Sequence, residues 1–324
     1  MSVAGLGLIG DVGATNARFA LVRPDGITTA ARTYVLNDYA SLTDLIDAYL
    51  AQESARPEQA VLAVASPITG DHVAFTNHPW TFSIEAVRKS FGLKRLRVIN
   101  DLAANALAIP HLADDDRLQI GPGCPVAGAP VGVIGPGTGL GVSALMPVSG
   151  GWAPIEGEGG HVTMAPFDAQ EGAVLEVMRR RYDHVSAERV LSGSGLVNLY
   201  GVICELAAAP AAPLTAPQIT DPRTWEEDPR ARDATAMFCA MLGTVAGNLA
   251  LTLGTRGGVH IAGGIVPKLG AAFTESGFRR RFEAKGRLQS YLAAIPTYVI
   301  VRPLSALVGA AALLERSDTA VRRS

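Results

Sequence analysis

Apolar and β-branched runs alternate with stretches of helical periodicity along the first part of the chain. The runs at 5–22 and 27–36 flank Pro24-Asp25-Gly26, and they predict adjacent strands joined by a turn. The segments that follow predict in turn a helix, a buried strand, a helix, a strand and a helix: 41–54, 60–65, 83–91, 95–100 and 102–109. Strands that alternate with helices in this way indicate an α/β fold.

A second cycle of the same kind opens at residue 131. Residues 131–147, VGVIGPGTGLGVSALMP, place a glycine-rich turn between two apolar strands, as residues 5–22 do near the start. Ile9-Gly10 and Ile134-Gly135 occupy corresponding places in the two runs. Two such cycles suggest two related domains facing one another, although the low identity between them does not prove a duplication.

The rest of the chain predicts a connection followed by further α/β elements. Five prolines between residues 207 and 229 predict an irregular surface connection without chemistry of its own. Periodicity then predicts a long helix at 231–253, a strand at 258–262 and a closing helix at 305–314.

The length of the chain also favours two domains. Its 324 residues exceed what one hydrophobic core usually serves. We expect the closing helix to pack back on the N-terminal part of the chain. The expected division is therefore a small α/β domain at 1–110 plus 303–324 and a large α/β domain at 111–302.

Composition and charge exclude several classes of protein. Hydrophobic residues make up 48% of the chain and charged residues 18%, with a net charge of −2, which is typical of a globular protein and selects no partner. The arginine clusters at 179–181 and 279–281 lie in segments with amphipathic helical periodicity, so we expect solvated helix faces there. Nucleic acid is not an expected partner.

Cysteine usage and the terminal sequence indicate a cytoplasmic protein. Cys124, Cys204 and Cys239 lack the paired spacing of a zinc or redox site, which fits a reducing compartment. Asp11 interrupts the apolar start of the chain before a secretion signal could be completed. Apolar stretches elsewhere are broken before the roughly 20 residues that a membrane span needs, so no membrane partner is expected.

Three glycine-rich loops carry the first candidate chemistry. Gly10-Asp-Val-Gly-Ala-Thr-Asn16 allows close approach of backbone to phosphate, and Asp11 is a candidate for holding hydrated Mg²⁺. Residues 135–141, GPGTGLG, and the AGGI of 262–265 are the second and third loops. Each is also an ordinary turn sequence, but three in two α/β halves favour nucleotide binding.

Other nucleotide-binding patterns fit poorly. Residues 5–10, GLGLIG, match the dinucleotide fingerprint letter for letter, but only four residues precede the match and a strand-like run follows it, so we interpret it as a chance match. The chain has no GxxxxGK[ST], HRD or DFG sequence, so neither a P-loop enzyme nor a protein kinase is indicated.

Two further segments place acids where a ligand could meet them. Asn100-Asp101 closes one predicted strand and opens a helix, which puts both at the carboxyl edge of a sheet; a simple helix cap at Asp101 is the alternative. Residues 156–161, EGEGGH, offer two carboxylates and an imidazole suited to a polyol, with metal binding as a weaker rival because one histidine makes a poor zinc set. Glu188 alone would be an ordinary helix charge.

Taken together, these motifs resemble the bacterial glucokinase family over nearly the whole chain. The matching segments, in order, are GDVGATNAR, VINDLAANALAIP, GPGTGLGVSAL, EGEGGHVTMAP, ERVLSGSGLVNLYG and VHIAGGI. The resemblance implies the two-domain actin-like ATPase (ribonuclease H-like) fold with an interdomain active-site cleft. It also implies a cytoplasmic, homodimeric enzyme that uses ATP and Mg²⁺ to convert glucose to glucose 6-phosphate for glycolysis.

The resemblance assigns roles to individual residues. Asp101 becomes the general base, and Asn100, Glu158, His161 and Glu188 join it in binding the sugar. The implied ATP-binding residues are Gly10, Asp11, Val12, Gly13, Ala14, Thr15, Gly137, Thr138, Gly263 and Gly264. Preference for glucose over mannose or galactose is likewise an implication of the family.

One position departs from the pattern of the family, and other segments bear on the choice between related families. Ala14 stands where a second glycine is usual, which narrows the phosphate turn slightly. Residues 68–83, ITGDHVAFTNHPWTFS, resemble the sugar-side loop of the family, without a role for any one atom. The zinc-binding cysteines and N-terminal extension of the related repressor family are missing. Two rivals remain, a sugar sensor without catalysis and an ATPase that assembles like actin.

Overall fold

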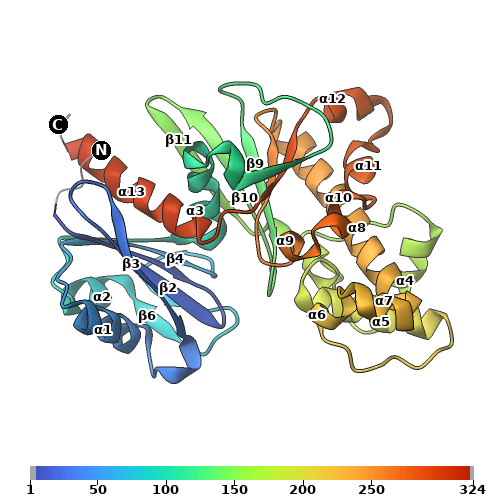
Figure 1. The fold of residues 1–324 in the computed structure, drawn as a ribbon, viewed down its shortest axis with the longest axis horizontal. Helices are drawn as coiled ribbons and strands as arrows, with labels where there is room; N and C mark the ends of the chain where they lie inside the picture. The colour runs from blue at the N-terminus through green and yellow to red at the C-terminus, as the bar shows by residue number, and fades with distance from the viewer. Residues whose placement is uncertain (1–4, 322–324) are drawn as a thin grey trace. The chain divides into compact units, whose positions relative to one another are not determined.

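The computed structural model describes residues 5–321, with side chains described as far as Leu314 (Figure 1). It divides into two compact units. Unit 1 comprises the described parts of 1–113, 152–156 and 302–324, and unit 2 comprises 114–151 and 157–301. The expected division into domains, 1–110 plus 303–324 and 111–302, stays a prediction.

Unit 1 is built on a five-stranded sheet in the order β3-β2-β1-β4-β7. The strands are β1 (Gly7–Val12), β2 (Asn16–Val22), β3 (Thr28–Val35), β4 (Gln59–Val64) and β7 (Arg95–Asn100). The first three form antiparallel neighbours, whereas β1, β4 and β7 run parallel to one another. The apolar run predicted at 5–22 thus holds two strands around a tight turn, and the glycine-rich turn expected inside it is confirmed.

Helices cover this sheet, and their ends follow ordinary capping rules. They are η1 (Leu36–Asp38), α1 (Leu42–Glu53), α2 (Ile84–Ser90), α3 (Asp101–Ala108), η2 (Ile109–His111) and α13 (Ser305–Val321). Ser41 caps α1 by accepting a hydrogen bond from the Asp44 N–H, and Ser54 ends the helix in a left-handed conformation. The C-terminal helix α13 packs against α3, where the closing helix was expected.

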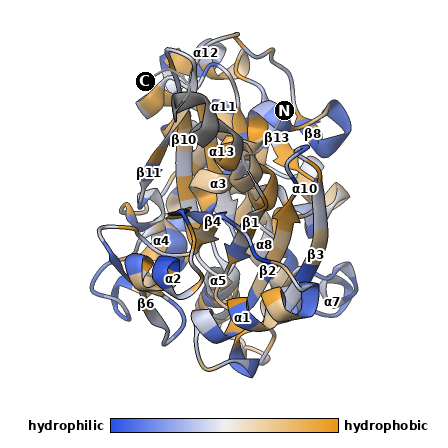
Figure 2. Cartoon of the chain, turned by 90° about the vertical axis from the view of Figure 1, so that its left-hand side faces the viewer, coloured by the Kyte–Doolittle hydropathy of each residue, from blue (hydrophilic) through white to orange (hydrophobic). Residues whose placement is uncertain are grey.

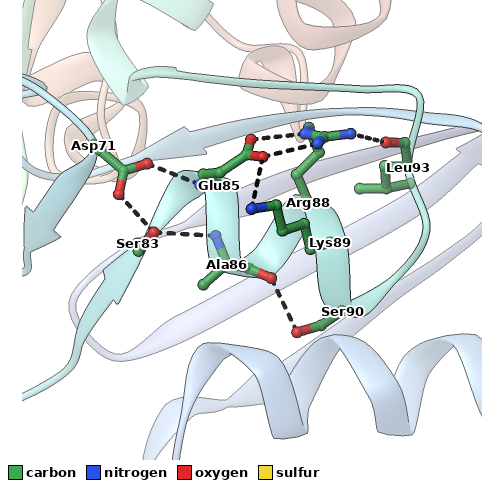
Figure 3. Close-up of polar contacts among 8 residues, drawn as sticks. All are labelled: Asp71, Ser83, Glu85, Ala86, Arg88, Lys89, Ser90 and Leu93. Atoms are coloured by element: carbon green, nitrogen blue, oxygen red, sulfur yellow. Dashed lines mark hydrogen bonds and ion pairs between the residues drawn. The ribbon is translucent and has the colours of Figure 1, made fainter.

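A short hairpin is fixed to α2 by polar contacts (Figure 3). It consists of β5 (His72–Ala74) and β6 (Thr81–Ser83). The Ser83 hydroxyl caps α2 through the Ala86 N–H and donates to Asp71 at 2.6 Å, while Asp71 also accepts the Glu85 N–H. These donors lower the pKa of Asp71, the Ser83 hydroxyl being the main cause. The base of the hairpin is therefore hydrogen-bonded to the first turn of α2.

Unit 2 repeats the same plan with a six-stranded sheet in the order β11-β10-β9-β12-β13-β8. The strands are β8 (Arg117–Ile120), β9 (Val131–Pro136), β10 (Leu140–Val148), β11 (Gly151–Gly157), β12 (Val259–Ile261) and β13 (Thr297–Ile300). β9 and β10 form the predicted hairpin, and β9, β12 and β13 are parallel. The sequence analysis predicted β9, β10 and β12 but did not predict β8, β11 or β13.

The helices of unit 2 surround one large apolar core. They are η3 (Asp114–Asp116), η4 (Gly159–His161), α4 (Ala169–Arg179), η5 (Ala187–Arg189), α5 (Gly193–Leu206), α6 (Ala216–Ile219), α7 (Pro222–Glu227), α8 (Pro229–Leu253), α9 (Val266–Leu269), α10 (Ala271–Thr274), α11 (Phe278–Glu283), η6 (Gly286–Leu288) and α12 (Gln289–Ala293). Figure 2 shows hydrophilic residues on α7, which buries no residue, and hydrophobic ones along much of α8.

The prediction of an irregular connection at 207–229 is wrong for part of that segment. Residues 216–227 form α6 and α7 instead. Their prolines lie in the first turn, where a missing N–H costs nothing and the fixed φ favours a helix. Asp221 supplies the cap of α7 by accepting the Arg223 N–H.

Helix α8 is long and apolar enough to cross a membrane by length and composition, alone among the helices of residues 5–321. In the fold, 61% of its most apolar window is buried. Residues such as Phe238, Met241 and Leu242 contribute to the core of unit 2. α8 therefore has the surroundings of a core helix.

The expectation of a solvated face at 279–281 is wrong for two of the three arginines. Arg281 is 5% exposed and pairs with the buried Glu171 at 2.7 Å, and it also donates to Thr244. Arg279 donates to main-chain carbonyls, including that of Ala293. A guanidinium is tolerated in the interior when its charge is paired and its N–H groups have acceptors. Only Arg280 of this cluster is exposed, while residues 179–181 are exposed as expected.

The contact between α3 and α13 predicts a glycine requirement. A Cβ at Gly309 would overlap the Ala104 carbonyl, whereas Gly201 in α5 has open space around its Cβ position. We expect Gly309→Ala to lose about 1–3 kcal/mol through overpacking, and Gly201→Ala to gain roughly 0.5–1 kcal/mol from helix propensity. Thermal unfolding of both variants checks this, and equal midpoints would contradict it.

A buried histidine predicts acid sensitivity of unit 2. His260 is 1% exposed, stacks on Tyr298 with ring centroids 4.8 Å apart, and has no hydrogen-bond partner on either ring nitrogen. Burial lowers its pKa to about 3, with a further contribution from Arg117. The unfolded chain takes up this proton below about pH 6.5, so stability falls as the pH drops from there towards 3.

We expect this one group to cost on the order of 2–3 kcal/mol at about pH 4.5. His260→Phe should flatten the pH dependence of the unfolding midpoint between pH ~6.5 and ~4.5, since the stacked ring is kept without the titrating group. His72→Gln, at an exposed position, is the control and should behave like the wild type. An unchanged slope in His260→Phe would show that other groups dominate.

Candidate active site

The carboxyl ends of three parallel strands meet at one edge of the unit 1 sheet. Val12 of β1 is paired with Val64 of β4, which is paired with Asn100 of β7. Neighbouring strands lie about 4.8 Å apart, so the loop after β1 and the start of α3 lie on the order of 10 Å apart. This edge is where ligands bind in open α/β sheets.

The first glycine loop contains glycines of two different kinds. Gly10 lies within β1, and a Cβ there would come 2.7 Å from the Phe19 ring, so core packing explains this glycine better than phosphate approach does. Gly13 begins the turn, where its N–H donates to the Asn16 carbonyl at 3.0 Å. The Thr15 side chain is exposed beyond it. A strand follows this loop, which confirms that the dinucleotide fingerprint at 5–10 is a chance match.

Asp11 is paired with a residue that the sequence analysis did not single out. Arg18 faces Asp11 directly across the β1–β2 hairpin and approaches it to 3.3 Å. Burial raises the pKa of Asp11, and the charge of Arg18 opposes this shift. The cross-strand register around the Gly13 turn was the signal that could have identified Arg18.

Asp11 also bears on Mg²⁺ binding. The described residues 5–321 contain no group of three or more acidic, histidine or cysteine side chains arranged for a metal. A dedicated protein cage of the zinc type therefore finds no support among them. Mg²⁺ commonly keeps its waters and is held by one or two carboxylates together with substrate phosphates, which a single carboxylate such as Asp11 suits.

The start of α3 corrects the alternative in which Asp101 caps the helix. Asn100 is the cap, because its Oδ1 accepts hydrogen bonds from Leu102 and Ala103. Asp101 occupies the first helical position, where its Oδ1 accepts the Leu102 N–H at 2.9 Å and its charge suits the helix dipole. The Asn105 side chain donates to the Asp101 carbonyl. These capping bonds use the Oδ1 of Asn100 and not its amide nitrogen.

Two glycine loops lie at the corresponding edge of the unit 2 sheet. β9 and β12 are parallel neighbours, so the loops that follow them leave the sheet side by side. Gly137 donates to the Gly139 carbonyl and accepts from the Gly193 N–H, while Thr138 is exposed. Gly263 has a φ of +81°, and a Cβ there would overlap the Pro136 carbonyl.

The sugar-binding candidates of unit 2 gather around Leu140 at the start of β10. The Glu188 carboxylate accepts the Leu140 N–H at 2.8 Å. A Cβ at Gly160 would overlap the Leu140 carbonyl, so η4 packs tightly against β10. His161 and Glu158 lie at the two ends of this turn, with the His161 Nε2 3.8 Å from the Glu158 Oε2, and both side chains are half-exposed. Glu188 is therefore no ordinary helix charge, because it is anchored to the glycine hairpin.

Two α/β units, each containing a hairpin closed by a glycine-rich turn, are typical of the actin-like ATPase (ribonuclease H-like) class. A solved glucokinase from an Antarctic psychrotroph shares this fold at a TM-score of 0.85 and 34% identity, over 96% of this chain and 99% of that one. A ROK family glucokinase from Streptomyces griseus, solved with glucose and AMPPNP, matches with a TM-score of 0.65 over 96% of this chain and all of that chain. At 20% identity it shows the fold alone.

Sequence comparison identifies the family within this class. The Glucokinase family model matches residues 8–317. A glucokinase of Aromatoleum aromaticum is 51% identical over 313 residues, which are 96% of this chain and 95% of its relative. The chain belongs to the glucokinase family.

The loop after β12 generates a prediction from a matched pair of glycines. Gly263→Ala strains a left-handed backbone and pushes on the Pro136 carbonyl, whereas Gly264 has open space at its Cβ position. We expect Gly263→Ala to lower stability by about 1–3 kcal/mol. Gly264→Ala should change it by less than about 1 kcal/mol. Thermal unfolding of the two variants decides, and equal losses would contradict the assigned geometry.

Proposed function

We propose that this chain transfers the γ-phosphoryl group of ATP to the 6-hydroxyl of D-glucose, with Asp101 as the general base. Family membership makes the chain an ATP-dependent glucose kinase. The observation that supports the role of Asp101 is its place in unit 1. It follows β7 at the sheet edge where the Gly13–Thr15 turn follows β1, two strands away.

The proposed mechanism depends on position more than on basicity. An ordinary aspartate is too weak a base to remove a proton from a free alcohol, so the proton passes to Asp101 late, as the new P–O bond forms and the oxygen becomes acidic. The bond between the γ-phosphorus and the bridging oxygen of ATP breaks, and ADP leaves. The capped start of α3 holds Asp101 in place for this step.

We assign sugar binding to Asn100, Glu158, His161 and Glu188, in addition to Asp101. The amide of Asn100 is a donor, and the carboxylates of unit 2 are acceptors for sugar hydroxyls. An epimer that leaves one such group without a partner, once the bound sugar covers that group, loses on the order of 1–3 kcal/mol. This accounting gives a physical basis for preferring glucose to mannose or galactose.

The nucleotide assignment follows the glycine loops. The turn at 10–15 is assigned to the phosphates, and Gly137, Thr138 and the Gly263-Gly264 pair complete the nucleotide site. Mg²⁺, held through water by Asp11 and by phosphate oxygens, would neutralise charge on the phosphates. Membership of the glucokinase family supports ATP and glucose as the two substrates.

The cellular setting is inferred from the same family. We infer a cytoplasmic homodimer whose product enters glycolysis. Cys124, Cys204 and Cys239 are all free thiols, which fits a reducing compartment. Size-exclusion chromatography with light scattering tests the dimer, and a single monomer mass across concentrations would refute it.

The central prediction concerns Asp101→Asn. We expect its turnover to fall by about 10²–10⁴-fold, the usual contribution of a general base, with glucose affinity nearly unchanged. Coupled ADP release across a panel of hexoses measures turnover, and calorimetry measures glucose binding. Asp47→Asn, an exposed carboxylate in α1, is the matched control and should keep wild-type activity. Near-normal turnover in Asp101→Asn would refute the role.

A further inference from the structure

A polar loop in unit 1 contacts the residues that follow β4, the strand between β1 and β7. The loop spans residues 75–80 and joins β5 to β6. The Thr76 N–H donates to the Ser66 hydroxyl at 3.0 Å. Ser66 comes two residues after β4, and β4 is the strand between β1 and β7.

This placement puts the loop where phosphate and alcohol must meet. The turn after β1 is assigned to the phosphates, and Asp101 follows β7. Val64 at the end of β4 is paired with both neighbouring strands at their last residues, and the Ala65 N–H continues the ladder by donating to the Val12 carbonyl. A phosphoryl group moving between the two sites therefore passes over the end of β4.

Contacts on several sides hold the loop in one conformation. Phe75 donates its N–H to the Trp80 carbonyl and packs on that ring with centroids 6.0 Å apart. His78 lies edge-on to Trp80 at 4.6 Å, and its Nε2 is 3.3 Å from the Asn37 Oδ1. The hairpin base is fixed to α2 through Asp71 (Figure 3). A loop tethered in this way can hold a donor in a defined position.

A second tether leads to the phosphate turn itself. Asn37 belongs to η1, and the neighbouring Leu36 N–H donates to the Thr15 carbonyl at 2.9 Å. The phosphate turn, η1 and the loop at 75–80 are thereby linked through hydrogen bonds. The relative positions of Thr15 and Thr76 are set within unit 1.

The hydroxyl of Thr76 is suited to donate to a phosphate. Its side chain is exposed, and its Oγ1 lies 3.5 Å from the Ser66 Oγ, a long and weak hydrogen bond. Ser66 is 2% exposed, and its own proton goes to the Ala65 carbonyl at 2.7 Å. Rotation of the Thr76 hydroxyl from Ser66 to an anionic phosphate oxygen exchanges a weak acceptor for a strong one.

We propose that Thr76 donates a hydrogen bond to the transferring phosphoryl group, and that Ser66 is the positioning residue that holds it there. The inference deepens the proposed function and rests on it. The donor acts where charge spreads over the phosphoryl oxygens, so its contribution is larger in the transition state than in the ground state.

The test compares Thr76→Val, Thr76→Ser, Ser66→Ala and the control Thr81→Val, an exposed threonine of β6 in the same hairpin. We expect Thr76→Val to lower kcat by about 10–100-fold with the KM for glucose within about threefold of wild type. Thr76→Ser restores most of the rate because it restores the hydroxyl. Ser66→Ala gives a smaller loss, and Thr81→Val gives none.

A readout specific to the phosphoryl group separates this role from loss of structure. Binding of ADP with aluminium fluoride and glucose mimics the transferring phosphoryl group, whereas ADP alone does not. We expect Thr76→Val to weaken the aluminium fluoride complex by about 10–100-fold and to leave ADP binding and the unfolding midpoint unchanged. Equal weakening of both complexes, or a serine variant as slow as the valine variant, overturns the proposal.

The outcome for the wild type keeps the two proposals apart. If the unaltered protein releases no ADP in the presence of glucose, the proposed function fails. If it is active and Thr76→Val matches it in kcat, the proposed function stands and the role of Thr76 falls.

Discussion

The parallel pairing of β1, β4 and β7 is the constraint on which the candidate site of unit 1 depends. Val12, Val64 and Asn100 are aligned across the three strands, so the chain must leave the sheet three times along one edge. The chain leaves β1 through a glycine turn, β4 through a loop anchored by Ser66, and β7 through the capped start of α3. A slip of one residue would send alternate side chains to the other face, so the buried core of the sheet also sets the register of the site.

Unit 2 applies the same constraint to its parallel strands β9, β12 and β13, and its glycines show two distinct uses. Gly160 and Gly263 are required because a side chain would overlap a neighbouring carbonyl, whereas Gly137 and Gly264 have open space at their Cβ positions. The first kind lets backbones approach each other within the protein, whereas a Cβ at the second kind would meet no neighbouring atom. A glycine-rich motif is therefore partly a consequence of packing. Gly10 in unit 1 is a further case, because a Cβ there would meet the side chains of Phe19 and Leu62.

Local features of the fold were predictable from sequence, whereas long-range partners were not. Periodicity located α1, β4, β7 and α8 within a few residues, because burial of an apolar face imposes it. Asn100 and Asp101 are equally good caps by composition, and only the geometry of α3 chooses between them. The burial of Arg281 depends on Glu171, 110 positions away by the difference of their numbers, and no local pattern announces such a pair.

The discontinuous make-up of unit 1 links the last helix to the proposed base. Ser305, at the start of α13, donates to Asn105, and Asn105 donates to the Asp101 carbonyl. Close packing at Gly309 brings the two helices together along their length. Contacts between residues so far apart in sequence carry a loop-closure cost that local contacts do not. The start of α3 therefore reaches its final support only when the end of the chain is in place, which makes the precise position of Asp101 a property of the whole chain.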